Sequence, residues 1–172
     1  MLSGLRQFVP SEVCLACDGC CRFKEENSSW RPKITSAEIG QIKTGGLAAE
    51  ILTKNPFGSD SHIKTVSCNG QHHCSFFNSE GNTCRIYQQR PFECQLYPFV
   101  LSRNSGKAGI FVHLNCPFIQ QTRHKPEFEK YVVYLKKFFQ TKDTVDLIQE
   151  NPELIGDYSA YGDELEYLFS LP

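Results

Sequence analysis

Four cysteines fall within residues 14–21 (CLACDGCC), in the pattern C-x₂-C-x₂-C-C. Cysteines three positions apart at a turn can direct their sulfur atoms toward one point, and this spacing recurs in zinc and iron–sulfur sites. We therefore expect Cys14, Cys17 and Cys20 to form one corner of a metal site. Because adjacent side chains tend to diverge, we expect Cys21 to face a second partner or a second metal.

The five remaining cysteines lie further along the chain. They are Cys68, Cys74, Cys84, Cys94 and Cys116. Each alone could be a small buried hydrophobic residue, and we prefer this interpretation for Cys68. The presence of several further cysteines favours metal ligation for the other four. With Cys68 set aside, eight cysteines remain, which is twice the four ligands of a structural zinc or a [4Fe–4S] cluster. Spacing does not separate the two metals; the triple favours iron–sulfur, because simple zinc sites usually use cysteine pairs.

Arg90 is the cation placed most suggestively, since it lies between Cys84 and Cys94. A guanidinium there could donate hydrogen bonds to sulfur and offset the charge of a thiolate-rich centre. An ordinary surface salt bridge is the alternative. Arg90 is therefore a candidate residue around the metal ligands, not a ligand itself.

Composition narrows the class of protein. The 172 residues predict a single domain, and the net charge of −1 gives no basic field for nucleic acid. No apolar run approaches the roughly 20 residues of a membrane span. Residues 1–13 are interrupted by polar residues and Pro10, so they do not have the pattern of a signal peptide. Nine cysteines in such a chain predict a cytoplasmic protein whose thiols are reduced or metal-bound.

Local patterns predict an α+β fold with an irregular cysteine-rich part (14–117) and a helical part (118–172). Thr35 and Glu38 have capping-box spacing and begin a helix that Gly45 ends. Trp30 is expected to anchor a polar loop in the core. The remaining predictions are a possible strand at 63–66, hairpins at 74–87 and 99–114, a helix at 126–139, and shorter helices around 145–148 and 165–169. The chain has no G-x-G-x-x-G or Walker loop for a nucleotide, and no recognisable cysteine-protease motif.

The motifs at residues 14–21 and 74–99 (CSFFNSEGNTCRIYQQRPFECQLYPF), with the trailing Cys116-Pro117, resemble those of the YkgJ-type cysteine-cluster family. Its members are described as zinc- or iron-chelating, and sometimes as Fe–S oxidoreductases. The resemblance implies eight ligands, namely Cys14, Cys17, Cys20, Cys21, Cys74, Cys84, Cys94 and Cys116. Gln88 and Gln95 stand where the family usually has Glu and Arg, so the usual charged surroundings of the centre are not all present.

The resemblance leaves two classes of function open. The first is a metal-holding protein with an iron–sulfur cluster or zinc, in a structural or electron-transfer role with a protein redox partner. The second is an Fe–S oxidoreductase or a protein-modifying enzyme, because the flagellin lysine N-methylase carries the same cysteine pattern within a longer chain. Saturation of the centre by eight cysteines favours the first.

Overall fold

The structure is a computed structural model that describes residues 4–17, 19–47 and 49–172. Helices make up 38% and small antiparallel sheets 22% of the chain, which confirms the predicted α+β class. The chain divides into two compact units. We name Pro10–Cys94 the cysteine unit, and Met1–Val9 together with Gln95–Pro172 the C-terminal unit. The organisation as one functional domain, with parts 14–117 and 118–172, stays a prediction.

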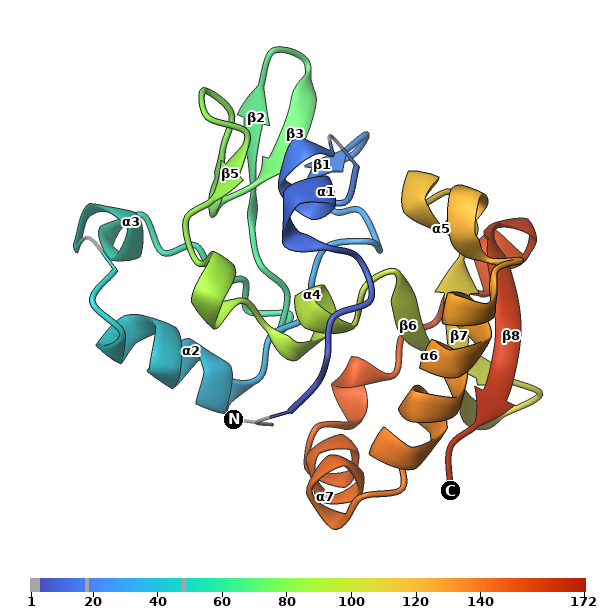
Figure 1. Ribbon diagram of the computed structural model, residues 1–172. Helices are drawn as coiled ribbons and strands as arrows, with labels where there is room; N and C mark the ends of the chain where they lie inside the picture. The colour runs from blue at the N-terminus through green and yellow to red at the C-terminus, as the bar shows by residue number, and fades with distance from the viewer. Residues whose placement is uncertain (1–3, 18, 48) are drawn as a thin grey trace. The chain divides into compact units, whose positions relative to one another are not determined.

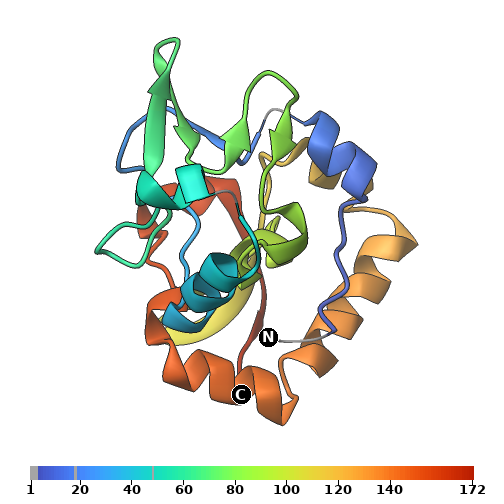
Figure 2. The same ribbon diagram turned by 90° about the vertical axis from the view of Figure 1, so that its left-hand side faces the viewer.

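The cysteine unit consists of short elements joined by loops (Figure 1). They are α1 (Ser11–Ala16), β1 (Arg22–Phe23), α2 (Ser36–Thr44), α3 (Ala49–Thr53), β2 (Thr65–Cys68), β3 (Gln71–Cys74), β4 (Phe77–Asn78), β5 (Thr83–Cys84), a 3₁₀ turn (Tyr87–Gln89) and the first residues of α4 (Phe92–Leu96). The strands form a three-stranded sheet in the order β1-β3-β2 and a separate β4–β5 hairpin. Figure 2 shows the β2–β3 and β4–β5 hairpins as two separate green ribbons.

The tight turns of this unit follow from its sequence. Cys68 pairs with Gln71 across a two-residue loop, so Asn69 and Gly70 must both adopt positive φ, at 49° and 78°. Asn-Gly is the pair that tolerates this conformation best. The hairpin at 74–87 is confirmed in a shorter form, since β4 and β5 pair Phe77 with Cys84. The possible strand at 63–66 is observed two residues later, as β2.

The predicted capping box at α2 is confirmed. The Thr35 side chain accepts a hydrogen bond from the Glu38 amide, and the Glu38 carboxylate accepts one from the Thr35 amide. The helix ends at Gly45, as expected. Ile42 on its inner face is fully buried.

The core of the cysteine unit is apolar apart from its sulfur atoms. It consists of Phe23, Ile34, Ile42, Phe57, Ile63, Cys74, Phe76, Phe77 and Ile86. Trp30 packs against this cluster, which confirms its predicted role as a loop anchor. Cys21 and Cys84 also pack against it, so three cysteines from distant parts of the sequence share one core.

The C-terminal unit contains a three-stranded antiparallel sheet in the order β6-β7-β8. Its elements after α4 are β6 (Phe99–Asn104), β7 (Lys107–His113), α5 (Pro117–Thr122), α6 (Pro126–Phe138), α7 (Lys142–Glu150), two 3₁₀ segments (Pro152–Leu154 and Ser159–Glu164) and β8 (Leu165–Ser170). The β6–β7 hairpin and α6, with Pro126 in its first turn, confirm the sequence predictions. The predicted helix around 145–148 is confirmed as α7.

The helix predicted around 165–169 is wrong, because this segment is strand β8. Its apolar residues fit either a short helix or a strand, and the edge of β7 decides between them. Leu165 pairs with His113 and Ser170 with Gly109, with a bulge between Ile110 and Phe111. A sheet edge offers backbone hydrogen bonds that a six-residue helix could form only poorly.

The buried stripe of α6 forms the core of the C-terminal unit, as its spacing predicts. Phe99 of β6 stacks on Phe128 and Tyr131 of α6, with ring centroids 5.9 and 5.2 Å apart. Phe8, from the N-terminal segment, packs edge-on against Phe99 and Phe128. Phe8 is thereby held by a helix that begins more than a hundred residues further along the chain. Among the residues that the structure describes, no helix has both the length and the apolar character to cross a membrane.

Candidate metal centre

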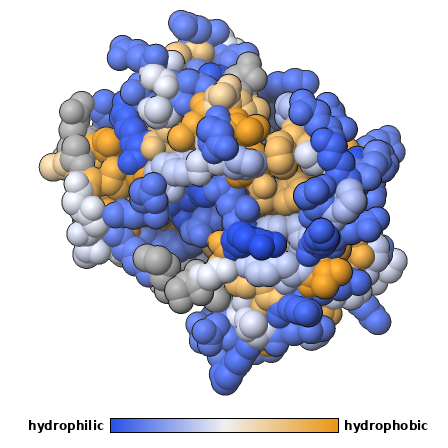
Figure 3. Space-filling model, in the orientation of Figure 1, coloured by the Kyte–Doolittle hydropathy of each residue, from blue (hydrophilic) through white to orange (hydrophobic). Residues whose placement is uncertain are grey.

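The first cysteine motif is positioned by a short helix and the turn that follows it. Helix α1 carries Cys14, and Cys17 ends the helix in an extended conformation with its amide donating to the Cys14 carbonyl at 3.3 Å. The chain then turns, with the Arg22 amide donating to the Gly19 carbonyl at 3.0 Å. Asp18 of the motif lies outside the described residues. Hydrophobic atoms reach the surface over α1 in Figure 3, where Val13 is 39% exposed.

The side chains of Cys20 and Cys21 do not diverge as the sequence suggested. A hydrogen bond between the two thiols raises the pKa of Cys20, which burial raises further, and lowers the pKa of Cys21. Assignment of Cys21 to a second centre therefore needs support from other residues.

The later cysteines of this unit are delivered by three different elements. Cys74 ends β3, and its amide donates to the Cys21 carbonyl at 2.9 Å. Cys84 ends β5, opposite Phe77. Cys94 is the third residue of α4. Backbone pairing thus brings residues 53 and 63 positions beyond Cys21 to the neighbourhood of the first motif.

Four thiols form a mutually interacting group, which we name the inner group: Cys21, Cys74, Cys84 and Cys94. Burial is the main cause that raises the pKa of Cys74 and Cys94 above the ordinary value, and it raises that of Cys84 to about 11. The remaining increase comes partly from the neighbouring thiolates, and each of the six pairs within the group contributes. A charge on any one of these sulfur atoms is therefore felt by the other three.

The other three thiols of the first motif, Cys14, Cys17 and Cys20, form what we name the outer group. Burial raises the pKa of Cys14, opposed first by the charge of Arg90, and the Cys17 and Cys21 thiolates raise it further. The pKa of Cys20 is raised first by its hydrogen bond with Cys21 and by burial, and further by the charges of Cys21, Cys14 and Cys94. Charges in the outer group and in the inner group affect each other's pKa values, but the outer group contains only three sulfur atoms.

Arg90 lies where the sequence placed it, among the thiols. Its charge lowers the pKa of Cys14, Cys21 and Cys84. The guanidinium carbon also stacks over the Tyr87 ring, 4.0 Å from its centroid. A positive charge shared by both groups of thiols favours their deprotonated, metal-binding form.

Two residues that the spacing did not single out also bear on the site. Arg22 lowers the pKa of Cys21, and its guanidinium stacks 4.6 Å from the Phe77 ring centroid while donating to Asn82 Oδ1 at 2.9 Å. Glu93, next to Cys94, raises the pKa of that thiol after the effects of burial and the neighbouring thiols. Adjacency to a cysteine was the only signal for either residue in the sequence.

Cys68 and Cys116 are not members of either group. Cys68 is at the tip of the β2–β3 hairpin, where it pairs with Gln71. Gln71 lies three residues before Cys74 on β3, so Cys68 is about 10 Å from Cys74 along the strands. This position agrees with its exclusion from the ligand set. Cys116 belongs to the C-terminal unit, where it is buried and precedes the first turn of α5. Its role as an eighth ligand stays a prediction.

The chemistry of the donor set fits a thiophilic metal, although the side chains are not placed as its ligands in this structure. Within residues 4–17, 19–47 and 49–172, no three Cys, His, Asp or Glu side chains are placed as ligands of one metal ion. Thiols with raised pKa values pack and hydrogen-bond instead, and a metal binds by displacing their protons. A sulfur-only set of neighbouring donors with Arg90 beside it is suited to zinc or an iron–sulfur cluster, and unsuited to magnesium or calcium.

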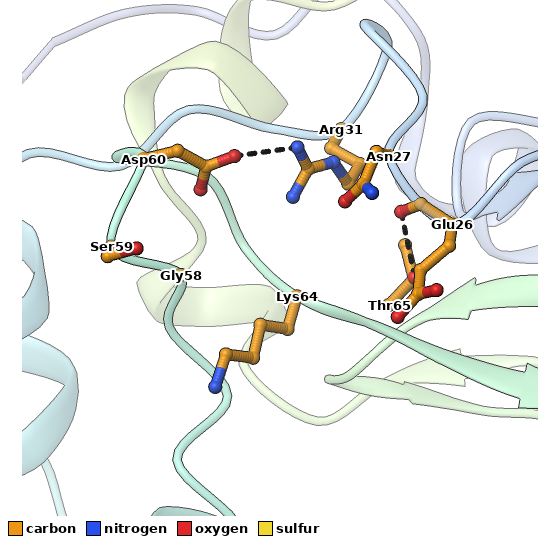
Figure 4. A pocket seen from close by; sticks show the side chains of 8 residues that line it. All are labelled: Glu26, Asn27, Arg31, Gly58, Ser59, Asp60, Lys64 and Thr65. Atoms are coloured by element: carbon orange, nitrogen blue, oxygen red, sulfur yellow. Dashed lines mark hydrogen bonds and ion pairs between the residues drawn. The ribbon is translucent and has the colours of Figure 1, made fainter.

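The cysteine unit also contains an open polar pocket of about 290 Å³ (Figure 4). The lining residues are Glu26, Asn27, Arg31, Gly58, Ser59, Asp60, Lys64 and Thr65. Its two walls are joined by a 2.7 Å ion pair between Arg31 and Asp60 and by a 3.0 Å hydrogen bond from Thr65 Oγ1 to the Glu26 carbonyl. A side chain at position 58 would crowd the Asp60 carboxylate and would place its Cβ 3.0 Å from the His62 carbonyl oxygen. The pocket contains no cysteine and is separate from the candidate metal centre.

Fold and site together define a small α+β protein organised around a cluster of neighbouring thiols. Comparison with known families agrees with this class. Residues 13–131 match the CxxCxxCC family, described as "Putative zinc- or iron-chelating domain". The chain therefore belongs to this family, as the sequence motifs suggested. No curated protein and no solved structure matches it.

Proposed function

We propose that this protein holds a metal centre in its cysteine unit through thiolate ligands. The observation that carries the proposal is that seven cysteines, spread from residue 14 to residue 94, lie within electrostatic range of one another. Packing alone does not require such a gathering, because buried cysteines can be replaced by other small hydrophobes. Binding would supply the free energy that holds these short elements together, so removal of the metal should unfold the unit cooperatively.

The inner group is proposed as one centre. Cys21, Cys74, Cys84 and Cys94 provide the four thiolates of a structural zinc or a cubane cluster. The outer group of Cys14, Cys17 and Cys20 is proposed as a second centre, for which Cys116 is the candidate fourth ligand. This division keeps the expectation that Cys21 serves a centre other than that of Cys20, although a hydrogen bond joins their thiols.

We favour iron–sulfur over zinc, in the reducing environment of the cytoplasm. A bound cluster would supply reversible one-electron transfer, whereas zinc would be structural. The residues of the chain would hold the centre, exclude water from the inner group by burial, and offset the thiolate charge through Arg90. The favoured role is a metal-holding or electron-transfer protein that works with a protein redox partner rather than with nucleic acid or a membrane.

An enzymatic role is the second candidate function, and one observation favours it. The outer group has three thiols within the cysteine unit, so a metal there could retain an open position if Cys116 is not a ligand. An open iron position can bind a substrate or S-adenosylmethionine, as an oxidoreductase or a methylase-related enzyme would need. Turnover that depends on the intact centre would favour this role.

Metal analysis tests the proposal. Protein purified without oxygen should contain iron and acid-labile sulfide and should absorb visible light. Stoichiometric zinc in a colourless protein would replace iron–sulfur by zinc, and the absence of any bound metal would refute the proposal.

Three serine variants test the division into two centres. Cys17→Ser should empty the outer centre and Cys21→Ser the inner one, each lowering total metal by about half, because serine is a poor ligand for soft metals. Cys68→Ser is the matched control and should retain all metal. Loss of all metal in both ligand variants would indicate one merged centre.

A further inference from the structure

Helix α4 is too short to hold Cys94 in place by itself. It has five residues, Phe92–Leu96, and an isolated helix of this length is unstable in water. The position of the Cys94 thiol must therefore be fixed by contacts that α4 makes with other segments. Two of those contacts come from one stretch of the cysteine unit, residues 33–38.

Glu38 uses both carboxylate oxygens, and it uses them on two different helices. Its Oε2 accepts hydrogen bonds from the Thr35 amide at 2.8 Å and the Thr35 hydroxyl at 2.9 Å, which completes the cap of α2. Its Oε1 accepts from the Phe92 amide, the first of α4, at 2.6 Å. The first amides of a helix have no acceptor within the helix, and a negative charge is favoured beside them. A single carboxylate thus joins the first turns of α2 and α4.

The next residue of α4 is held by the same stretch. Glu93 Oε2 accepts from the Lys33 amide at 2.5 Å, and Oε1 pairs with the Lys33 ammonium at 3.0 Å. Both side chains are nearly excluded from solvent, at 8% and 9% exposed. Phe92 itself is 4% exposed, so its ring is locked in packing as well. Residues 92 and 93 are therefore fixed from both their backbone and their side chains, immediately before Cys94.

We propose that Glu38 is a positioning residue for the thiol cluster, which sets where Cys94 presents its sulfur to the inner group. Glu38 does not touch a cysteine; it acts through the Phe92 amide. Its function is to make α4 a fixed support, so that the Cys94 thiol stays beside the other three thiols of the inner group. This inference rests on the proposed metal function, but its first test does not need a metal.

The test uses Glu38→Ala with Thr35→Ala as the matched control. Thr35→Ala removes the hydroxyl from the α2 cap but leaves Glu38 Oε1 on the Phe92 amide. Glu38→Ala removes both contacts. A weakening of α2 alone would affect both variants, whereas a loosened α4 would affect only Glu38→Ala.

The first readout is alkylation of Cys94 in folded, reduced, metal-free protein, resolved residue by residue by mass spectrometry. Glu38→Ala should increase the rate at Cys94 roughly tenfold or more, as expected for the loss of a hydrogen bond to a charged group. The rate at Cys68 should not change. Equal rates at Cys94 in wild type, Glu38→Ala and Thr35→Ala would overturn the inference, whether or not the protein binds metal.

Because removal of the metal is expected to unfold the cysteine unit, a second readout carries the test in the loaded protein. Cobalt(II) replaces zinc as the probe, and its thiolate charge-transfer band reports the number and geometry of sulfur ligands. Glu38→Ala should weaken this band and lower metal affinity about 10- to 100-fold, with Thr35→Ala close to wild type. An unchanged band and affinity in Glu38→Ala would refute the positioning role. Absence of cobalt binding by the wild type would instead refute the proposed function.

Discussion

The Lys33 ammonium and the Glu93 carboxylate form an ion pair at 3.0 Å, with both side chains nearly excluded from solvent. The pair joins the loop before α2 to the helix that carries Cys94. The pair matters for stability chiefly because removal of one member leaves the charge of the other member buried. A buried charge without its partner loses its solvation and gains nothing in return.

Removing one member of this pair should strongly destabilise the cysteine unit. We expect Glu93→Gln to lower the free energy of unfolding by about 3–5 kcal/mol, because it leaves the Lys33 charge buried without its carboxylate. The double variant Lys33→Met/Glu93→Gln should recover part of that loss, since the buried Lys33 ammonium is also removed. Denaturant unfolding of the metal-loaded proteins measures both. A double variant less stable than Glu93→Gln would contradict this account.

Metal affinity should rise with pH. The pKa of Cys84 is about 11, and burial raises the pKa of Cys74 and Cys94, so these ligands carry protons at neutral pH. Metal binding must expel the protons, and each one expelled strengthens binding roughly tenfold per pH unit below the thiol pKa. Competition with a chromophoric chelator at pH 6, 7 and 8 measures the slope. A flat profile would indicate that these thiols are not ligands.

His113 should make the C-terminal unit less stable in mild acid. Burial lowers its pKa, outweighing the opposing hydrogen bond and charge of Glu164, whose carboxylate lies 3.3 Å from Nε2. The unfolded chain then binds a proton more readily than the native one, so stability is full above about pH 6.5 and falls as the pH drops toward the native pKa. In His113→Gln, the part of the pH dependence of the unfolding free energy that comes from His113 should disappear. Subtracting the two unfolding profiles removes the protonation of the cysteines, which both proteins share.

Gly109 should not tolerate a side chain. A Cβ there would lie 2.9 Å from the Phe169 carbonyl oxygen and 3.0 Å from the Tyr167 ring. The position is next to the bulge in the pairing of β7 with β8. We expect Gly109→Ala to destabilise the unit by roughly 1–3 kcal/mol through overpacking. Gly162→Ala is the control, because among the described residues no atom lies within 4 Å of its Cβ position. Equal thermal midpoints for the two variants would refute the steric argument.

The sequence predicted the elements whose signals are local. The Thr35–Glu38 capping box, the two hairpins and the α6 stripe each depend on residues a few positions apart, and all are observed. The strand at 165–170 was missed because its state depends on the edge of β7, more than fifty residues earlier. Local periodicity carries no information about such an edge.

In the candidate site, too, local patterns could be predicted and long-range contacts could not. Cysteine spacing and family resemblance identify the thiols, and Arg90 was found because it lies between two of them. The contact of Glu38 with the Phe92 amide could not be predicted, since the two residues are 54 positions apart and the capping box already explains Glu38. The hydrogen bond between the Cys20 and Cys21 thiols contradicted the expectation that adjacent side chains diverge.

The packing of Phe8 against Phe99 and Phe128 has a consequence for synthesis on the ribosome. Residues 10–94 form one continuous stretch, whereas the C-terminal unit needs both the first nine residues and everything after position 95. Since chains emerge from the N-terminus and domains generally fold as units, the cysteine unit can close while α6 is still unmade. Phe8 cannot make its contacts with Phe99 and Phe128 until those two residues have been synthesised. Metal could thus be acquired on a nascent chain, before the protein is complete.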